Sequence, residues 1–158
     1  YIKKIKNLIS YEKKIKIKKI NIYKEFDYNI KKIQKKLTMK IDLILKQNKK
    51  IYILGASTKG NTILQFLNIN KNTIPYAIER NKQKIGAKTI GSNIMIISEK
   101  FAEKNRPDYK LVLPWHFKSE IINRELNYIK KGGKLIFPLP KVLTIDKKNY
   151  LKHVKQDY

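Results

Sequence analysis

The stretch that most constrains this chain covers residues 51–67, which read IYILGASTKGNTILQFL. It opens with a short apolar run that is dense enough for a buried strand, and this run ends at Gly55. Small and polar residues follow, and after Gly60 the apolar residues are spaced as on the buried face of a helix. A strand, a glycine loop and a helix in this order open nucleotide-binding α/β folds. The stretch therefore predicts such a fold, with a place for a phosphate at the loop.

Further apolar runs predict five more strands, at residues 74–78, 94–97, 109–113, 135–137 and 142–145. Between them, Ser98 is a suitable N-cap for a short helix that ends before Pro107. A second helix is expected over residues 119–131, where Gly132 and Gly133 supply a left-handed cap. This alternation predicts an α/β domain whose sheet is mostly parallel and has helices on both faces.

A long amphipathic helix is expected before the first strand, over residues 23–48. Its apolar residues fall three or four positions apart, with Lys and Gln between them: Phe26, Ile30, Ile33, Leu37, Ile41, Ile44 and Leu45. A basic amphipathic helix can bind lipid or a calmodulin-like partner. Packing of the apolar stripe on the sheet is the simpler interpretation, and we favour it.

The first 22 residues alternate isoleucine with lysine clusters and carry two conflicting patterns. Ile15 and Ile17 have the period of two of an edge strand, whereas Ile2, Ile5 and Leu8 have helical spacing. We interpret residues 1–22 as a solvated linker, and residues 147–158 as a polar tail.

The net charge of +25 suggests a polyanionic partner such as nucleic acid. However, only three basic residues are arginine, the residue best suited to reading phosphates and bases, and the lysines are spread over the whole chain. Enrichment in isoleucine and asparagine alongside lysine indicates a compositional bias instead. The absence of cysteine excludes disulfides and thiolate metal sites, and fits a cytoplasmic location. No apolar run approaches the roughly 18 residues of a membrane span, so no membrane partner is expected.

Residues 55–60, here called the glycine loop, match two phosphate-binding motifs incompletely. In the dinucleotide motif GxGxxG, Ser57 replaces the middle glycine, which normally lets the backbone approach a pyrophosphate. In the P-loop motif GxxxxGK[ST], Thr62 matches but Asn61 replaces the lysine that contacts the β- and γ-phosphates. The loop still gathers backbone N–H groups, the hydroxyls of Ser57 and Thr58, and Lys59 at a helix N-terminus, which suits a phosphate oxygen. The alternative is a tight turn without a ligand.

Two further groups follow strands of the predicted sheet. Glu79 and Arg80 come after the second strand, where an acidic residue often binds a ribose hydroxyl, although a surface salt bridge is equally consistent. Trp115 and His116 follow the fourth strand, where Trp115 could stack on a base or sugar and His116 could contact a hydroxyl or act as a general base. Alternatively, both are structural. No pattern of metal ligands accompanies them.

Four motifs in this order resemble a known family: GASTKGNT at 55–62, ERN at 79–81, PDYKLVLPWHF at 107–117 and GGKLIFPLP at 132–140. They look like the C-terminal domain of sugar C-methyltransferases, S-adenosylmethionine-dependent enzymes that act on nucleotide-activated deoxysugars. The likeness covers about residues 9–145. It implies a Rossmann-like three-layer domain over residues 23–146, preceded by the long amphipathic helix.

The resemblance also implies that different domains of a longer chain carry different functions. Members of the family have an N-terminal zinc-binding region, a middle methyltransferase domain and this C-terminal domain, with the active site between the last two. Residues 1–22 would then be a linker from an upstream methyltransferase domain. That domain would bind S-adenosylmethionine and supply the catalytic base, so we assign neither here. This fragment would hold no cofactor or metal and would be inactive alone.

By the same resemblance, the partners are the upstream domain and a nucleotide-diphosphate sugar. The residues expected to contact this substrate are Ser57, Thr58, Lys59, Gly60, Asn61, Thr62, Glu79, Arg80, Trp115 and His116. Two alternative functions remain open. One is a stand-alone Rossmann-like module that binds a nucleotide or NAD, which Ser57 disfavours. The other is a nonspecific basic nucleic-acid binder, motivated by charge alone.

Overall fold

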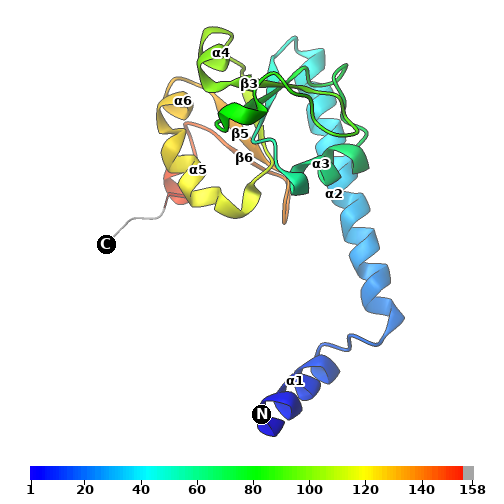
Figure 1. The fold of residues 1–158 in the computed structure, drawn as a ribbon. Helices are drawn as coiled ribbons and strands as arrows, with labels where there is room; N and C mark the ends of the chain where they lie inside the picture. The colour runs from blue at the N-terminus through cyan, green and yellow to red at the C-terminus, as the bar shows by residue number, and fades with distance from the viewer. Residues whose placement is uncertain (155–158) are drawn as a thin grey trace. The chain divides into compact units, whose positions relative to one another are not determined.

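The computed structural model describes residues 1–154 and divides into two compact units, Tyr1–Lys35 and a second that begins at Lys36 (Figure 1). The predicted polar tail therefore lies partly outside the described residues. The first unit contains α1 (Ile2–Lys14), which buries none of its residues, and the beginning of α2 (Ile20–Lys46). The helical pattern at Ile2 and Ile5 is thus the correct one. The alternative strand at Ile15 and Ile17 is wrong, because the chain turns there through Lys16, at φ 56°.

The part of α2 that belongs to the second unit packs through one stripe. Leu37, Ile41 and Ile44 are its buried residues, spaced four and three apart as the sequence predicts. Phe26, in the first unit, is 63% exposed. The amphipathic helix is therefore confirmed, and its burial is confined to its C-terminal half.

The second unit contains a six-stranded sheet in the order β3-β2-β1-β4-β5-β6. Every pairing is parallel except that of β5 with β6. All four residues of the central strand β1 are buried, which is why its sequence is continuously apolar. The strands are β1 (Ile51–Leu54), β2 (Tyr76–Glu79), β3 (Met95–Ser98), β4 (Tyr109–Val112), β5 (Lys134–Phe137) and β6 (Leu143–Ile145).

Helices cover both faces of this sheet. One face packs against α4 (Glu99–Lys104), α5 (Lys118–Arg124) and α6 (Leu126–Lys130). Its core joins strand residues such as Leu54 and Val112 to Ala102, Ile122 and Ile129 of these helices. Because neighbouring strand residues alternate between faces, Ile51 and Ile53 point to the opposite side, which α2 and α3 (Thr58–Phe66) cover. The predicted Rossmann-like, three-layer α/β fold is confirmed.

The helix ends follow the predicted caps, with one correction. Ser98 caps α4 by accepting a hydrogen bond of 3.2 Å from the Phe101 N–H, and Gly132 has φ 91° after the last helix. The helix expected over residues 119–131 is instead two short helices, because the chain leaves helical geometry at Glu125, where ψ is 11°.

The connection from β2 to β3 contains only a short 3-10 turn, Lys82–Lys84, in place of a crossover helix. After it, the chain runs antiparallel to β3. The Gly86 N–H donates to the Ile96 carbonyl and the Ile96 N–H to the Ala87 carbonyl, both at 2.9 Å, and Lys88 forms a bridge with Met95.

Candidate functional site

Close packing explains both glycines of the glycine loop. Gly55 has φ 87°, a left-handed conformation, and a Cβ atom added there would lie 2.8 Å from Pro114 Cδ. A Cβ atom added at Gly60 would lie 2.6 Å from Leu113 Cδ1. The loop and the start of α3 are therefore pressed against the end of β4. This contact brings the glycine loop next to the corner that leads into Trp115.

Ser57 is the N-cap of α3. Its hydroxyl oxygen accepts a hydrogen bond of 3.1 Å from the Gly60 N–H, and its backbone is extended, as an N-cap requires. The backbone N–H groups of Thr58 and Lys59 have no partner within residues 1–154. These two donors, together with the positive end of the helix dipole, form a small anion-attracting surface.

Both carboxylate oxygens of Glu79 accept hydrogen bonds from backbone N–H groups. Its Oε2 accepts from the Ala56 N–H at 2.9 Å, and its Oε1 accepts from the N–H groups of Arg80 and Asn81 at 2.8 and 3.1 Å. Burial alone would raise the pKa of Glu79. The hydrogen bonds from Asn81, Ala56 and Arg80 and the nearby Lys84 ammonium outweigh burial, so the net pKa is lowered. The carboxylate therefore fastens the glycine loop to the end of β2.

Lys84 also reaches the glycine loop, and the sequence analysis missed it. Its ammonium donates a 3.0 Å hydrogen bond to the Ala56 carbonyl. Lys84 belongs to the 3-10 turn after β2, and the carboxyl ends of neighbouring parallel strands lie at one edge of a sheet. The position of Lys84 shortly after β2 could have predicted its contact with the loop. The chain contains so many lysines that this one does not stand out in the sequence.

The other predicted loop residues differ in exposure. Thr58, Lys59 and Thr62 are exposed, whereas Asn61 is half-buried. The Asn61 Oδ1 atom is buried and has no hydrogen-bond partner in the described part of the chain. A buried acceptor without a donor is uncommon in folded proteins, so this atom has unused capacity for a hydrogen bond, which a ligand or water molecule would fill only after gaining access to it.

Trp115 and His116 form part of a short 3-10 turn, Trp115–Phe117, directly after Pro114. Trp115 is partly buried and packs against the core, so it has a structural role in addition to any binding role. His116 is exposed, and its ring lies 5.6 Å from the Trp115 ring and 4.3 Å from the Phe117 ring.

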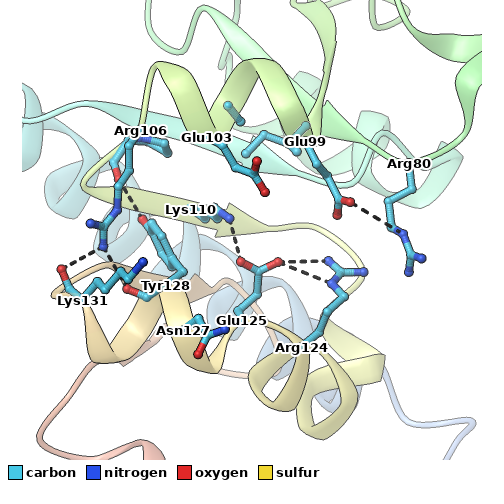
Figure 2. Close-up of a pocket in the computed structure, with 13 residues that line it drawn as sticks. Arg80, Glu99, Glu103, Arg106, Lys110, Arg124, Glu125, Asn127, Tyr128 and Lys131 are labelled. Atoms are coloured by element: carbon cyan, nitrogen blue, oxygen red, sulfur yellow. Dashed lines mark hydrogen bonds and ion pairs between the residues drawn. The ribbon is translucent and has the colours of Figure 1, made fainter.

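Arg80 points away from the glycine loop. Its Nε lies 3.9 Å from the Glu99 carboxylate of α4, and its side chain lines a groove over the sheet (Figure 2). The structure thus joins the glycine loop to Glu79 and to the Pro114 corner, whereas the Arg80 side chain contacts Glu99 of α4.

The described residues offer neither a metal site nor a membrane span. Residues 1–154 contain no group of three or more His, Cys, Asp or Glu side chains placed to hold a metal ion. Within the same residues, no helix combines the length and the apolar character that a membrane span needs.

Comparison with known proteins decides the family. The family described as C-methyltransferase C-terminal domain matches residues 1–140. The chain belongs to this family. One curated relative, the C-methyltransferase NovU of Streptomyces niveus, is 28% identical over 129 residues. The matched region covers 82% of this chain and 31% of that protein, so the chain spans about a third of its relative.

In this C-methyltransferase C-terminal domain, the glycine loop combines two unpaired N–H groups, the exposed Lys59 and a partnerless Asn61 oxygen. Lys84 adds a second positive charge at the loop. Donors and positive charge at a helix N-terminus can hold an anionic oxygen, and the Asn61 oxygen can accept a hydrogen bond from a hydroxyl.

Proposed function

We propose that this domain contacts the nucleotide-sugar substrate of a S-adenosylmethionine-dependent C-methyltransferase, and that the glycine loop holds its diphosphate. In such a reaction, a methyl group passes to an acidic carbon next to a ketone of a nucleotide-activated deoxysugar. The observation that carries the proposal is the pair of unpaired N–H groups of Thr58 and Lys59 at the start of α3. The family match supplies the context.

The same loop does not fit S-adenosylmethionine. A ribose hydroxyl would need an acceptor at the end of β2, and the Glu79 carboxylate there already accepts three backbone hydrogen bonds, which leaves one acceptor position, on Oε2. In addition, the middle position of the loop carries the Ser57 side chain, where dinucleotide sites have glycine. We therefore propose that the cofactor is bound by a methyltransferase domain outside residues 1–158 and that this chain alone transfers no methyl group. The misfit also argues against a stand-alone NAD module.

Within the proposed site, each residue has a distinct role. The Thr58 and Lys59 N–H groups and the Lys59 ammonium bind diphosphate oxygens, and the Asn61 oxygen accepts from a hydroxyl. Glu79 shapes the loop, and its Oε2, which accepts only from the Ala56 N–H, can also accept from a substrate hydroxyl. Trp115 and His116 border the loop through Pro114, where they can contact the nucleotide or the sugar.

Calorimetry with deoxythymidine diphosphate tests the diphosphate site. The chain should bind this ligand, and the double variant Lys59→Ala, Asn61→Ala should bind at least tenfold more weakly, since a charge-assisted hydrogen bond contributes about 1.5–3 kcal/mol. Lys100→Ala, at an exposed position of α4, is the matched control for lost charge. Equal affinity of the wild-type chain and the double variant would disprove the loop assignment. Binding of NAD without binding of the diphosphate would favour the stand-alone module instead.

A salt titration separates this proposal from nonspecific nucleic-acid binding. Attraction of a polyanion to the net charge of +25 should vanish as salt rises. Specific nucleic-acid binding that persists above physiological salt would contradict the compositional interpretation of the charge.

A further inference from the structure

All three arginines of this chain, Arg80, Arg106 and Arg124, line a single groove. Arg80 follows β2, Arg106 precedes β4 and Arg124 ends α5, yet they meet between α4 on one side and α5 and α6 on the other (Figure 2). The chain has 37 lysines and arginines, so arginine is the exception among its basic residues. Its concentration here indicates that this place needs a planar guanidinium rather than a point charge. We call this cavity the arginine groove.

The arginine groove has the size of a small-molecule site. Its volume is about 680 Å³, within the range of roughly 300–1,000 Å³ that is usual for ligand pockets. Lys110 of β4 lies at its base, with the apolar side chains of Ile78 and Ala102 among its lining residues. It is therefore large enough for a phosphorylated sugar.

A buried ion pair forms the centre of the groove. Lys110 Nζ lies 2.6 Å from Glu125 Oε2, and the two side chains are only 13% and 8% exposed. Lys110 Nζ also lies 4.2 Å from the centre of the Tyr128 ring. Because the pair neutralises itself, it provides a fixed polar base and leaves the groove's other charges for a ligand.

The three arginines differ in how far their N–H donors are already used in contacts within the protein. Arg106 donates from Nη2 to the carbonyls of Tyr128 and Lys131, at 3.0 and 2.8 Å, and so fastens the end of α6. Arg124 makes only long contacts with Glu125, at 3.3 and 3.4 Å. Arg80 reaches no closer than 3.9 Å to Glu99, beyond hydrogen-bonding distance. Arg80 and Arg124 thus retain donors for an incoming anion.

The residues that line the groove carry charges of both signs, with a positive excess. Five cationic side chains face three carboxylates, which leaves an excess of positive charge: Arg80, Arg106, Lys110, Arg124 and Lys131 against Glu99, Glu103 and Glu125. Glu103 has no ion-pair partner among residues 1–154, and Figure 2 shows it pointing from α4 into the groove. A ligand that suits this lining carries an anionic group and hydroxyl donors.

We propose that the arginine groove binds a small phosphate ester that carries hydroxyl groups, a second ligand site separate from the glycine loop. The guanidinium groups of Arg80 and Arg124 hold the phosphate oxygens through paired N–H donors, a geometry that lysine lacks. Hydroxyl groups of the ligand donate to the free Glu103 carboxylate. A sugar phosphate and a nucleoside monophosphate share this chemistry.

Calorimetry on the whole chain with three probes tests the proposal. Ribose 5-phosphate should bind more tightly than inorganic phosphate, because only the former has sugar hydroxyls that can reach Glu103 while its phosphate contacts the arginines. Adenosine monophosphate distinguishes the two sources, since a nucleotide site should prefer it to ribose 5-phosphate. The double variant Arg80→Lys, Arg124→Lys keeps the charge and should bind the preferred probe at least tenfold more weakly. Lys130→Ala, an exposed neighbour outside the lining, should bind normally.

Two further measurements keep the outcome interpretable. The urea unfolding midpoint of the double arginine variant should match that of the wild-type chain, which shows that the groove is intact. The variant Lys59→Ala, Asn61→Ala should retain the affinity, because the glycine loop is a separate site. Equal binding by wild type and the arginine variant, loss of binding in the loop variant, or no saturable binding of any probe by the folded chain would each overturn the proposal.

Discussion

The Glu79 carboxylate accepts a 2.9 Å hydrogen bond from the Ala56 N–H, across 23 residues of sequence. This bond links the end of β2 to the glycine loop that follows β1. An acidic residue at this place commonly serves a ribose in dinucleotide-binding domains. Here the same carboxylate binds its own backbone, so a position associated with ligand recognition has become part of the support of the loop.

Replacement of Glu79 by glutamine should destabilise the domain by about 1–2 kcal/mol at neutral pH, because the glutamine amide has only one accepting oxygen and its NH2 group faces a backbone donor. The folded-state pKa of Glu79 lies below its ordinary value of 4.5, so the carboxylate's contribution is complete above that value. It is lost as the pH falls through the lower, folded-state pKa. Urea unfolding of both proteins between pH 3 and 7 measures this difference.

The stability difference between wild type and Glu79→Gln should therefore shrink at acid pH. Comparison of the two proteins cancels the titration of the other carboxylates. A difference that stays constant from pH 7 to pH 3 would show that the charge of Glu79 does not matter.

Substitutions at Ser57 separate helix capping from phosphate binding. Ser57→Ala should lose about 1 kcal/mol, since the Gly60 N–H loses its acceptor. Ser57→Asp should retain the cap and match or exceed wild-type stability, because a negative charge is favourable at a helix N-terminus. The aspartate should nevertheless repel deoxythymidine diphosphate and abolish its binding in calorimetry. Undiminished binding by Ser57→Asp would place the diphosphate elsewhere.

Gly60→Ala should destabilise the domain by about 1–3 kcal/mol, because the new Cβ would lie 2.6 Å from Leu113 Cδ1 and force α3 away from β4. Helix propensity alone predicts the opposite, since alanine is favoured over glycine by about 1 kcal/mol. Thermal unfolding of Gly60→Ala, with Thr62→Ala at an exposed position of the same helix as control, decides between the two. A stabilised Gly60→Ala protein would refute the close contact.

The buried pair of Lys110 and Glu125 should respond non-additively to substitution. Lys110→Met leaves the Glu125 carboxylate with only the longer contact to Arg124 and should cost about 2–4 kcal/mol. Glu125→Met leaves the lysine unpaired and should cost a similar amount. The double variant should lose much less than the sum, which a double-mutant cycle by urea unfolding measures. Strict additivity would show that the two groups do not interact.

The order of strands and helices could be predicted because each strand is a short apolar run between turn residues. The second strand shows the precision of such predictions: it was expected from Ile74, and it begins at Tyr76, just after Pro75. Proline has no N–H to offer to a neighbouring strand, so the first residues of the apolar run lie outside the ladder.

Two helical details could not be predicted. The isoleucine and lysine repeats near the N-terminus satisfy both helix and strand patterns, and α1 has no buried face that would distinguish them. The helix is interrupted at Glu125, whose carboxylate lies 2.6 Å from the ammonium of Lys110 on β4. The apolar spacing of residues 119–131 gives no information about Lys110, because that residue lies on β4.

The glycine loop was located from sequence, but its hydrogen bonds were not. The pattern of small residues gave its place, while the use of Ser57 as a cap and of Glu79 as a backbone acceptor depends on side-chain direction. The arginine groove illustrates the same limit of pattern reading. Its arginines are 26 and 18 residues apart along the chain, at positions 80, 106 and 124, and only the fold brings them together.

The antiparallel course of the chain along β3 has a consequence for association between molecules. An uncovered edge strand offers a row of N–H and C=O groups to any passing chain and so invites aggregation. Here the Gly86 N–H and the Ala87 carbonyl already occupy the groups of Ile96, at 2.9 Å each, and Lys88 adds a positive charge at the same margin. The domain therefore covers this part of β3 with its own chain, and a second copy cannot pair directly with the backbone groups of Ile96.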